Sequence, residues 1–178
     1  MEELTKIMVS KVLKKMQSNN NVFSINMTEN DLTKDYMVKF LFDEIKKHGI
    51  NPNRLVVELL ETITASNDNV LKTIEKLQWV WIKVSIDDFG TWFSNFARLL
   101  SLKPDYLKVD GSLIKWIASD NKKLETVRII SDLWKLFWSK LVAEFVEDKE
   151  TQDIIELLWI DYSQGYLYSK PSEKLIWE

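Results

Sequence analysis

The sequence predicts an α/β fold, a (β/α) barrel of the TIM type, on three observations. Short β-branched runs alternate with amphipathic stretches along the 178-residue chain, which is typical of parallel strands joined by crossover helices. Each of the six strand-like runs ends in a polar residue, and in a (β/α) barrel the active site lies at that end of the strands. Packing alone does not explain a polar residue at every strand end, so this feature favours a barrel over a doubly wound sheet.

The first half of the chain predicts helices and strands in alternation. Each helix has apolar residues three or four positions apart, and each strand is a short run rich in β-branched residues. Gly49 directly follows one helix, as is common at a helix C-terminus. The predicted elements are a helix with a Leu4, Met8, Val12 and Met16 stripe, strand Val22–Asn26, helix Asn30–His48, strand Arg54–Glu61, a helix carrying Val70, Ile74 and Leu77, and strand Ile82–Ile86.

The second half continues the alternation. Its predicted elements are a loop and helix over Phe93–Leu102, strand Tyr106–Val109, a helix carrying Leu124, Val127, Ile130, Trp134 and Phe137, strand Lys140–Phe145, helix Lys149–Leu158 and strand Ile160–Ser163. The polar residues at the ends of the six strands are Asn26, Glu58, Asp87 with Asp88, Lys108, Glu144 and Gln164.

Composition excludes several classes of protein. A net charge of -3 argues against a general binder of polymeric nucleic acid, which normally shows a basic patch. The absence of cysteine excludes disulfides and thiolate metal sites. No apolar run is long enough to span a membrane. We therefore expect one soluble, cytoplasmic domain over residues 1–178.

Two adjacent acids, Asp87 and Asp88, point to the chemistry. They end a β-branched run in the segment VSIDDFGTWF and are followed by Gly90. Neighbouring carboxylates repel one another and lose solvation when buried, so such a pair needs a counter-charge. A divalent cation with hard oxygen ligands is the commonest one. Together with Lys108, which lies among apolar neighbours in the next strand, this pair predicts a metal-dependent hydrolase.

Six collinear segments resemble the EAL domain, the cyclic-di-GMP phosphodiesterase family. Each segment alone is a weak match, but they occur in the family's order over nearly the whole chain, from about Asn20 to Pro171. The segments are SINMT, VELLE, SIDDFGTWFSNF, YLKVD, VAEFVE and DYSQGYLYSKP.

The resemblance implies hydrolysis of cyclic-di-GMP to linear pGpG with two Mg²⁺ or Mn²⁺ ions. It implies metal ligation by Asn26, Glu58, Asp87 and Asp88. Lys108 would orient the attacking water or meet phosphate charge, and Glu144 would hold Lys108 or act as a base. Gln164 would hydrogen-bond the metal–water cluster, and Glu61 would anchor the loop after Asp88. The resemblance further implies a homodimer and an upstream sensory or cyclase domain.

One departure from the family concerns the N-terminus. The Glu-Ala-Leu motif on the first barrel strand, whose Glu is a metal ligand in the family, has no counterpart in this sequence. We therefore expect a barrel that is incomplete at the N-terminus and lacks its first strand. The alternative to an active phosphodiesterase is a degenerate EAL domain that senses cyclic-di-GMP or binds another protein.

A second departure concerns tryptophan. The chain has 8 Trp and 4 Gly, whereas average usage predicts roughly 12 glycines in a chain of this length. Trp81, Trp138 and Trp159 each lie between a helix and the following strand, where glycine is favoured. Trp92 replaces a glycine typical of the family. We hypothesise that the organism reads UGA as glycine at these positions; the alternative is a diverged homologue that tolerates tryptophan.

Overall fold

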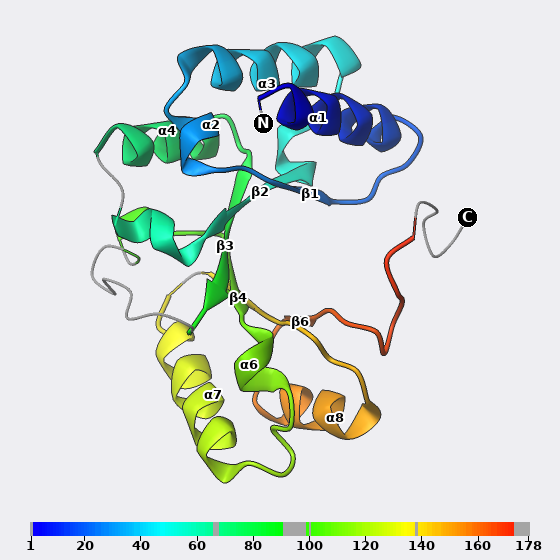
Figure 1. Ribbon diagram of the computed structural model, residues 1–178, viewed down its shortest axis with the longest axis vertical. Coiled ribbons are helices and arrows are strands. Elements are labelled where there is room, and N and C mark those ends of the chain that lie inside the picture. The colour runs from blue at the N-terminus through cyan, green and yellow to red at the C-terminus, as the bar shows by residue number, and fades with distance from the viewer. Residues whose placement is uncertain (1, 66–67, 91–98, 100, 138, 173–178) are drawn as a thin grey trace. The chain divides into compact units, whose positions relative to one another are not determined.

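A computed structural model describes residues 2–65, 68–90, 99, 101–137 and 139–172 (Figure 1). The chain divides into two compact units. The first comprises Met1–Ile86 and Ser94–Asp105, and the second comprises Asp87–Phe93 and Tyr106–Glu178. Strand β3 (Lys83–Phe89) runs from the first unit into the second.

The strands follow one another in chain order within the sheet, β1-β2-β3-β4-β5-β6. The β1–β2, β4–β5 and β5–β6 pairs are parallel. A doubly wound sheet reverses its strand order part-way, whereas a (β/α) barrel adds each strand beside the previous one. The predicted fold class is therefore confirmed, with fewer strands among the described residues than a closed barrel has. The remaining strands are β1 (Phe23–Asn26), β2 (Leu55–Leu60), β4 (Tyr106–Val109), β5 (Lys140–Ala143) and β6 (Tyr162–Ser163).

In the first unit, helix α1 (Glu2–Met16) packs against α3 (Asp35–His48) and β1. Its buried face consists of Val9, Leu13 and Met16, which are fully buried. The predicted stripe was wrong in part, because Leu4 is 69% exposed and Met8 and Val12 are only half-buried, whereas Met16 is fully buried. The residues that repeat along the face turned toward α3 start at Val9, and Leu4 lies outside that repeat.

The predicted helix Asn30–His48 is divided into α2 (Glu29–Leu32) and α3. Thr28 and Asp31 cap α2 reciprocally: the Asp31 N–H donates to Thr28 Oγ1 at 3.3 Å, and the Thr28 N–H donates to Asp31 Oδ2 at 2.9 Å. Lys34 has an extended backbone and separates the two helices. The prediction of one continuous helix was therefore wrong, because apolar periodicity continues across this break.

The rest of the first unit follows the prediction closely. Helix α4 (Asp68–Trp79) buries Val70, Ile74 and Leu77 completely. Two short 3-10 helices, η1 (Pro52–Arg54) and η2 (Glu61–Ala65), flank β2. The predicted helix within Phe93–Leu102 lies largely outside the described residues.

In the second unit, α6 (Gly111–Ile114) packs against α7 (Asn121–Trp134), and α7 contacts β5. The indole of Trp134 is 2% exposed and its ring centroid lies 6.0 Å from that of Phe89. Helix α8 (Lys149–Leu157) precedes β6. Helix α6 was not predicted, since four residues are too few to show a helical period; Asp110, which caps it by accepting from the Ser112 N–H at 2.8 Å, was the available signal.

Two of the tryptophans at positions where the sequence predicts that glycine is favoured have a left-handed backbone. Trp81 has a φ of 68° and Trp159 a φ of 59°. Trp116, which the sequence did not single out, has a φ of 67°. Trp92 and Trp138 lie outside the described residues. Separately, none of the helices in the described part of the chain has both the length and the apolar character needed to cross a membrane.

Candidate active site

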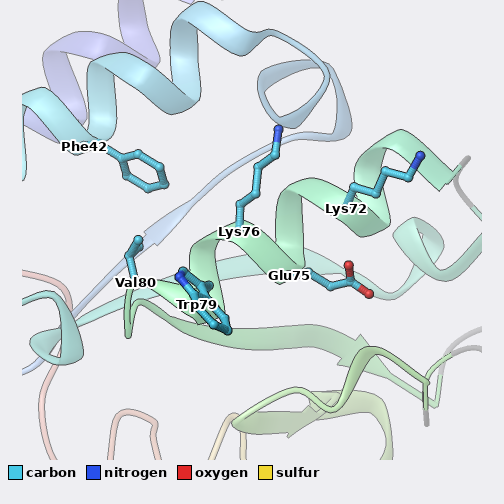
Figure 2. Close-up of a pocket in the computed structure, with 6 residues that line it drawn as sticks. All are labelled: Phe42, Lys72, Glu75, Lys76, Trp79 and Val80. Carbon is cyan, nitrogen blue, oxygen red and sulfur yellow. The ribbon is translucent and has the colours of Figure 1, made fainter.

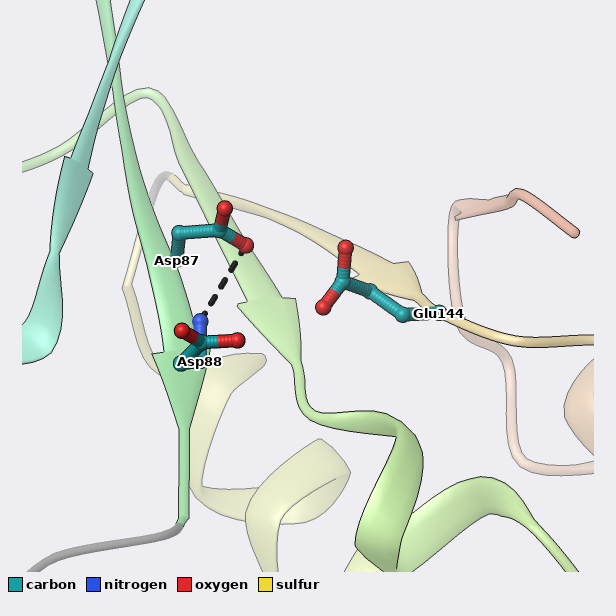
Figure 3. Close-up of side chains that lie close together, drawn as sticks. All are labelled: Asp87, Asp88 and Glu144. Atoms are coloured by element: carbon teal, nitrogen blue, oxygen red, sulfur yellow. Dashed lines mark hydrogen bonds between the residues drawn. The ribbon is translucent and has the colours of Figure 1, made fainter. Parts of the chain in front are cut away.

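Three carboxylates gather in the second unit (Figure 3). Asp87 and Asp88 come from the end of β3, and Glu144 directly follows β5. One oxygen of each carboxylate lies within 4.8 Å of the others. The fold therefore brings these three predicted site residues together.

The backbone of Asp88 explains how two consecutive residues join one cluster. Successive side chains of a regular strand point to opposite faces. Asp88 has a left-handed backbone, with a φ of 57°, which interrupts that alternation. Its N–H donates to Asp87 Oδ1 at 3.1 Å (Figure 3). Aspartate tolerates this backbone better than most residues, so the chain holds both carboxylates on one side.

Lys108 supplies the positive charge of the cluster. It lies in β4 between the fully buried Leu107 and Val109, and is itself 6% exposed. Its Nζ lies 2.9 Å from Asp87 Oδ1 and 2.7 Å from Glu144 Oε1. A buried lysine needs such partners, because an unpaired ammonium is costly in an apolar environment.

Gln164 completes the described cluster. It directly follows β6, and its Nε2 donates to Glu144 Oε1 at 2.9 Å. The carboxylate of Glu144 therefore accepts from both Gln164 and Lys108. These two contacts fix the position of Glu144, which is 4% exposed.

Burial raises the pKa of two of the acids. Desolvation raises the pKa of Glu144 from 4.5 to about 7, although Lys108 acts in the opposite direction. Desolvation also raises the pKa of Asp88, and the charges of Asp87 and Asp110 raise it further. Both acids therefore take up protons more readily in the folded chain than in the unfolded chain.

This pKa shift predicts a pH dependence of stability for the metal-free protein. Between pH 4.5 and about 7 the folded chain binds more protons at Glu144 than the unfolded chain does. The free energy of unfolding should therefore fall as pH rises through this interval. We expect Tm, measured in the presence of a chelator, to fall less steeply for Glu144→Gln than for the wild type. Parallel profiles for the two proteins would contradict the shift.

The donor set fits a divalent cation. If all groups are ionised, three carboxylates face one ammonium, which leaves the cluster with an excess of negative charge. Carboxylate oxygens are the ligands that Mg²⁺ and Mn²⁺ prefer. Bound cations would offset both the excess charge and the desolvation of Asp88 and Glu144.

Three further predicted site residues lie in the first unit. Asn26 and Glu58 are register partners in the parallel β1–β2 pair, so they lie side by side on neighbouring strands. Asn26 ends β1, whereas Glu58 lies within β2. Glu61 begins η2 directly after β2 and is 2% exposed. The loop that Glu61 was predicted to anchor lies largely outside the described residues.

Asp110 is the residue near the cluster that the sequence did not single out. Its charge raises the pKa of Asp88, and its side chain also caps α6. The available signal was an acid directly after the lysine strand, in the segment YLKVD. An acid at the end of a strand is as readily explained by capping, so the sequence alone did not distinguish the two roles.

A separate pocket of about 540 Å³ lies in the first unit (Figure 2). None of the predicted site residues lines it. Its lining residues are Phe42, Lys72, Glu75, Lys76, Trp79 and Val80. Since Glu75 is the single carboxylate among them, the pocket does not offer the clustered acids of a divalent metal site.

Comparison with protein families decides the relationship that the motifs suggested. The model of the EAL domain matches residues 1–171. The chain belongs to the EAL domain family. The solved EAL domain of Mycobacterium smegmatis DcpA is 29% identical to this chain, with a TM-score of 0.83. The match covers 94% of this chain and 76% of that one. A structure described as the PaMucR phosphodiesterase in complex with c-di-GMP is 26% identical, with a TM-score of 0.89, over 95% of this chain and 76% of that one.

Two curated relatives are longer proteins that contain a similar segment. The probable cyclic di-GMP phosphodiesterase PdeA of Escherichia coli is 33% identical over 84% of this EAL chain and 21% of its own length. The cyclic di-GMP phosphodiesterase PdeA of Borreliella burgdorferi is 31% identical over 95% of this chain and 26% of its own length. The chain thus spans about a quarter or less of either relative.

Proposed function

We propose that this EAL chain hydrolyses cyclic-di-GMP to linear pGpG with two Mg²⁺ or Mn²⁺ ions. The observation that carries the proposal is the placement of Lys108 between Asp87 and Glu144, with Asp88 beside them. The named activity of the relatives supports the same substrate. A buried set of acids with one lysine combines metal-ligating and proton-transferring groups, as hydrolysis of a phosphodiester requires.

The residues have distinct proposed roles. Asn26, Glu58, Asp87 and Asp88 would ligate the metal ions, which when bound polarise the phosphodiester and lower the pKa of water. Lys108 would orient the attacking water or meet phosphate charge. Gln164 would hold Glu144 and hydrogen-bond the metal–water cluster. Glu61 would anchor the loop after Asp88, a positioning role.

Glu144 has the environment of a general base. A catalytic base works best when its pKa lies near the working pH, and burial raises the pKa of Glu144 to about 7. Its contact with Lys108 at 2.7 Å gives it a second role, which is to hold the ammonium in place.

The test of the proposal is product formation by the natural full-length protein. With Mn²⁺, we expect chromatography to show loss of cyclic-di-GMP and formation of linear pGpG. The alternative from the sequence, a degenerate EAL domain that acts as a sensor or interaction module, predicts binding of cyclic-di-GMP without product. That outcome would overturn the proposed activity.

Metal binding should stabilise the chain in a pH-dependent way. At a free Mn²⁺ concentration about 100 times Kd, linkage gives roughly 2.7 kcal/mol, or a rise in Tm of about 5–10 °C for a chain of this size. The rise should shrink as pH falls from 7 to 5, because protons compete with the metal for Glu144 and Asp88. Differential scanning fluorimetry with Mn²⁺ and with chelator measures it; Asp153→Asn, at an exposed position on α8, should behave as the wild type.

The homodimer and the upstream sensory or cyclase domain remain predictions. Light scattering after size-exclusion chromatography of the natural full-length protein measures the first. The gene sequence upstream of Met1 tests the second.

A further inference from the structure

Helix α3 ends in a hydrogen-bonded turn that requires a left-handed residue. The N–H of Gly49 donates to the Lys46 carbonyl at 3.2 Å, and the N–H of Ile50 donates to the Ile45 carbonyl at 3.1 Å. This pair of bonds defines the Schellman motif. Gly49 has the φ of 63° that the motif needs, and glycine adopts it without steric cost.

Helices α4 and α8 end in the same motif, with tryptophan at the glycine position. At the end of α4, the Trp81 N–H donates to the Gln78 carbonyl at 2.9 Å, and the Ile82 N–H donates to the Leu77 carbonyl at 3.0 Å. At the end of α8, the Trp159 N–H donates to the Glu156 carbonyl at 3.0 Å, and the Ile160 N–H donates to the Ile155 carbonyl at 3.2 Å. In all three motifs a buried isoleucine follows the left-handed residue: Ile50, Ile82 and Ile160. The chain therefore builds one helix end three times, once with glycine and twice with tryptophan.

A bulky residue with a positive φ is a steric outlier. Trp81 and Trp159 match Gly49 in φ to within a few degrees, and Trp116, after α6, has a φ of 67°. Cβ approaches the following carbonyl in this conformation. The three tryptophans are thus strained at their backbones in the same way.

Packing does not offset this strain. Trp81 is 75% exposed, Trp116 is 76% exposed and Trp159 is 78% exposed. Phe145 also has a positive φ, of 55°, but it is less exposed and Lys115 Nζ lies 4.5 Å from its ring centroid. An exposed indole on a left-handed backbone gains neither burial nor a favourable conformation.

Trp134 shows what a tryptophan favoured by the fold looks like. It lies in α7, is 2% exposed, and its ring centroid is 5.6 Å from that of Phe137. The tryptophans of the described residues therefore include one with the environment of an aromatic core residue and three with the environment of glycine.

We infer that Trp81, Trp116 and Trp159 are glycine in the protein as its organism makes it, because their codons are UGA and the organism reads UGA as glycine. Trp134 is encoded by UGG and is tryptophan. The excess of tryptophan over glycine, 8 against 4, follows directly from this decoding. The inference does not depend on the proposed activity.

The gene and the natural protein test the inference together. We expect UGA at positions 81, 116 and 159 and UGG at position 134. Mass spectrometry of peptides from the natural protein should show glycine at the first three positions and tryptophan at the last. A UGG codon at position 81, 116 or 159, a peptide with tryptophan there, or UGA at position 134 would overturn the inference.

The strain has its own measurement. For the 178-residue chain, Trp81→Gly and Trp159→Gly should each raise Tm by about 2–4 °C. Gly49→Trp is the matched reverse change, since nothing lies within 4 Å of a Cβ at that position, and it should lower Tm by a similar amount. Trp134→Gly should lower Tm more, because it opens a cavity in the core. A fall in Tm for Trp81→Gly or Trp159→Gly would contradict the inference.

Discussion

The Asp87→Asn variant of the natural protein should hydrolyse cyclic-di-GMP about 10³-fold more slowly than the wild type, or slower still. Asp87 contacts Lys108 at 2.9 Å and shares the acidic cluster with Asp88 and Glu144. Removal of its charge weakens metal binding and weakens the attraction between Asp87 Oδ1 and the Lys108 ammonium. A loss of several kcal/mol of transition-state stabilisation, the scale of metal catalysis, corresponds to this decrease in rate.

Because asparagine has nearly the same shape as aspartate, the Asp87→Asn variant separates the effect of the charge from the effect of packing. Asparagine keeps the shape of the side chain and the oxygen that accepts the Asp88 N–H, so Tm without metal should change little. Asp153→Asn on α8 is the matched control, because Asp153 is exposed and its ion pair, with Lys149 at 2.7 Å, lies within the same helix. Its rate should equal that of the wild type. An Asp87→Asn variant with wild-type kcat/KM would contradict the assignment of Asp87.

Replacement of Lys108 by methionine should have the largest effect on stability. The change keeps the aliphatic stem in the core of β4 but leaves Asp87 and Glu144 facing one another without their cation. Breaking a buried ion pair by removing one partner costs about 3–5 kcal/mol. We expect a loss of this size in urea unfolding without metal, together with a loss of hydrolysis.

Two variants test the cause of that loss. Lys83→Met removes a lysine from a partly exposed pair, in which Nζ lies 3.4 Å from Asp105 Oδ1, and should cost less than about 1 kcal/mol. Adding Glu144→Gln to Lys108→Met removes one of the unpaired acids and should restore part of the stability. A double variant that is no more stable than Lys108→Met would show that the loss does not arise from the unpaired carboxylates.

Much of the fold follows from periodicity. Val70, Ile74 and Leu77 recur on one helix face and are fully buried, and Tyr106–Val109 is a strand with the predicted bounds. Periodicity did not detect the break between α2 and α3, where Lys34 has an extended backbone. The sequence pattern also predicted a strand that ends at Ile86, before Asp87 and Asp88, whereas β3 continues to Phe89 and includes both acids.

The site was predictable in part for a physical reason. Parallel strands bring their C-terminal ends to one edge, so polar residues at those ends were expected to meet; Asp87, Asp88, Lys108, Glu144 and Gln164 do meet. The contacts themselves were not predictable. The left-handed backbone of Asp88 and the acceptance of two donors by one oxygen of Glu144 depend on tertiary packing.

Manganese binding at the acidic cluster tests the central claim most directly. A titration of the natural full-length protein with Mn²⁺, followed by electron paramagnetic resonance, counts the bound ions in the wild type and in Asp87→Asn. The proposed site predicts two bound ions per wild-type chain and loss of at least one of them in the variant. Equal binding by the two proteins would contradict a metal site at Asp87.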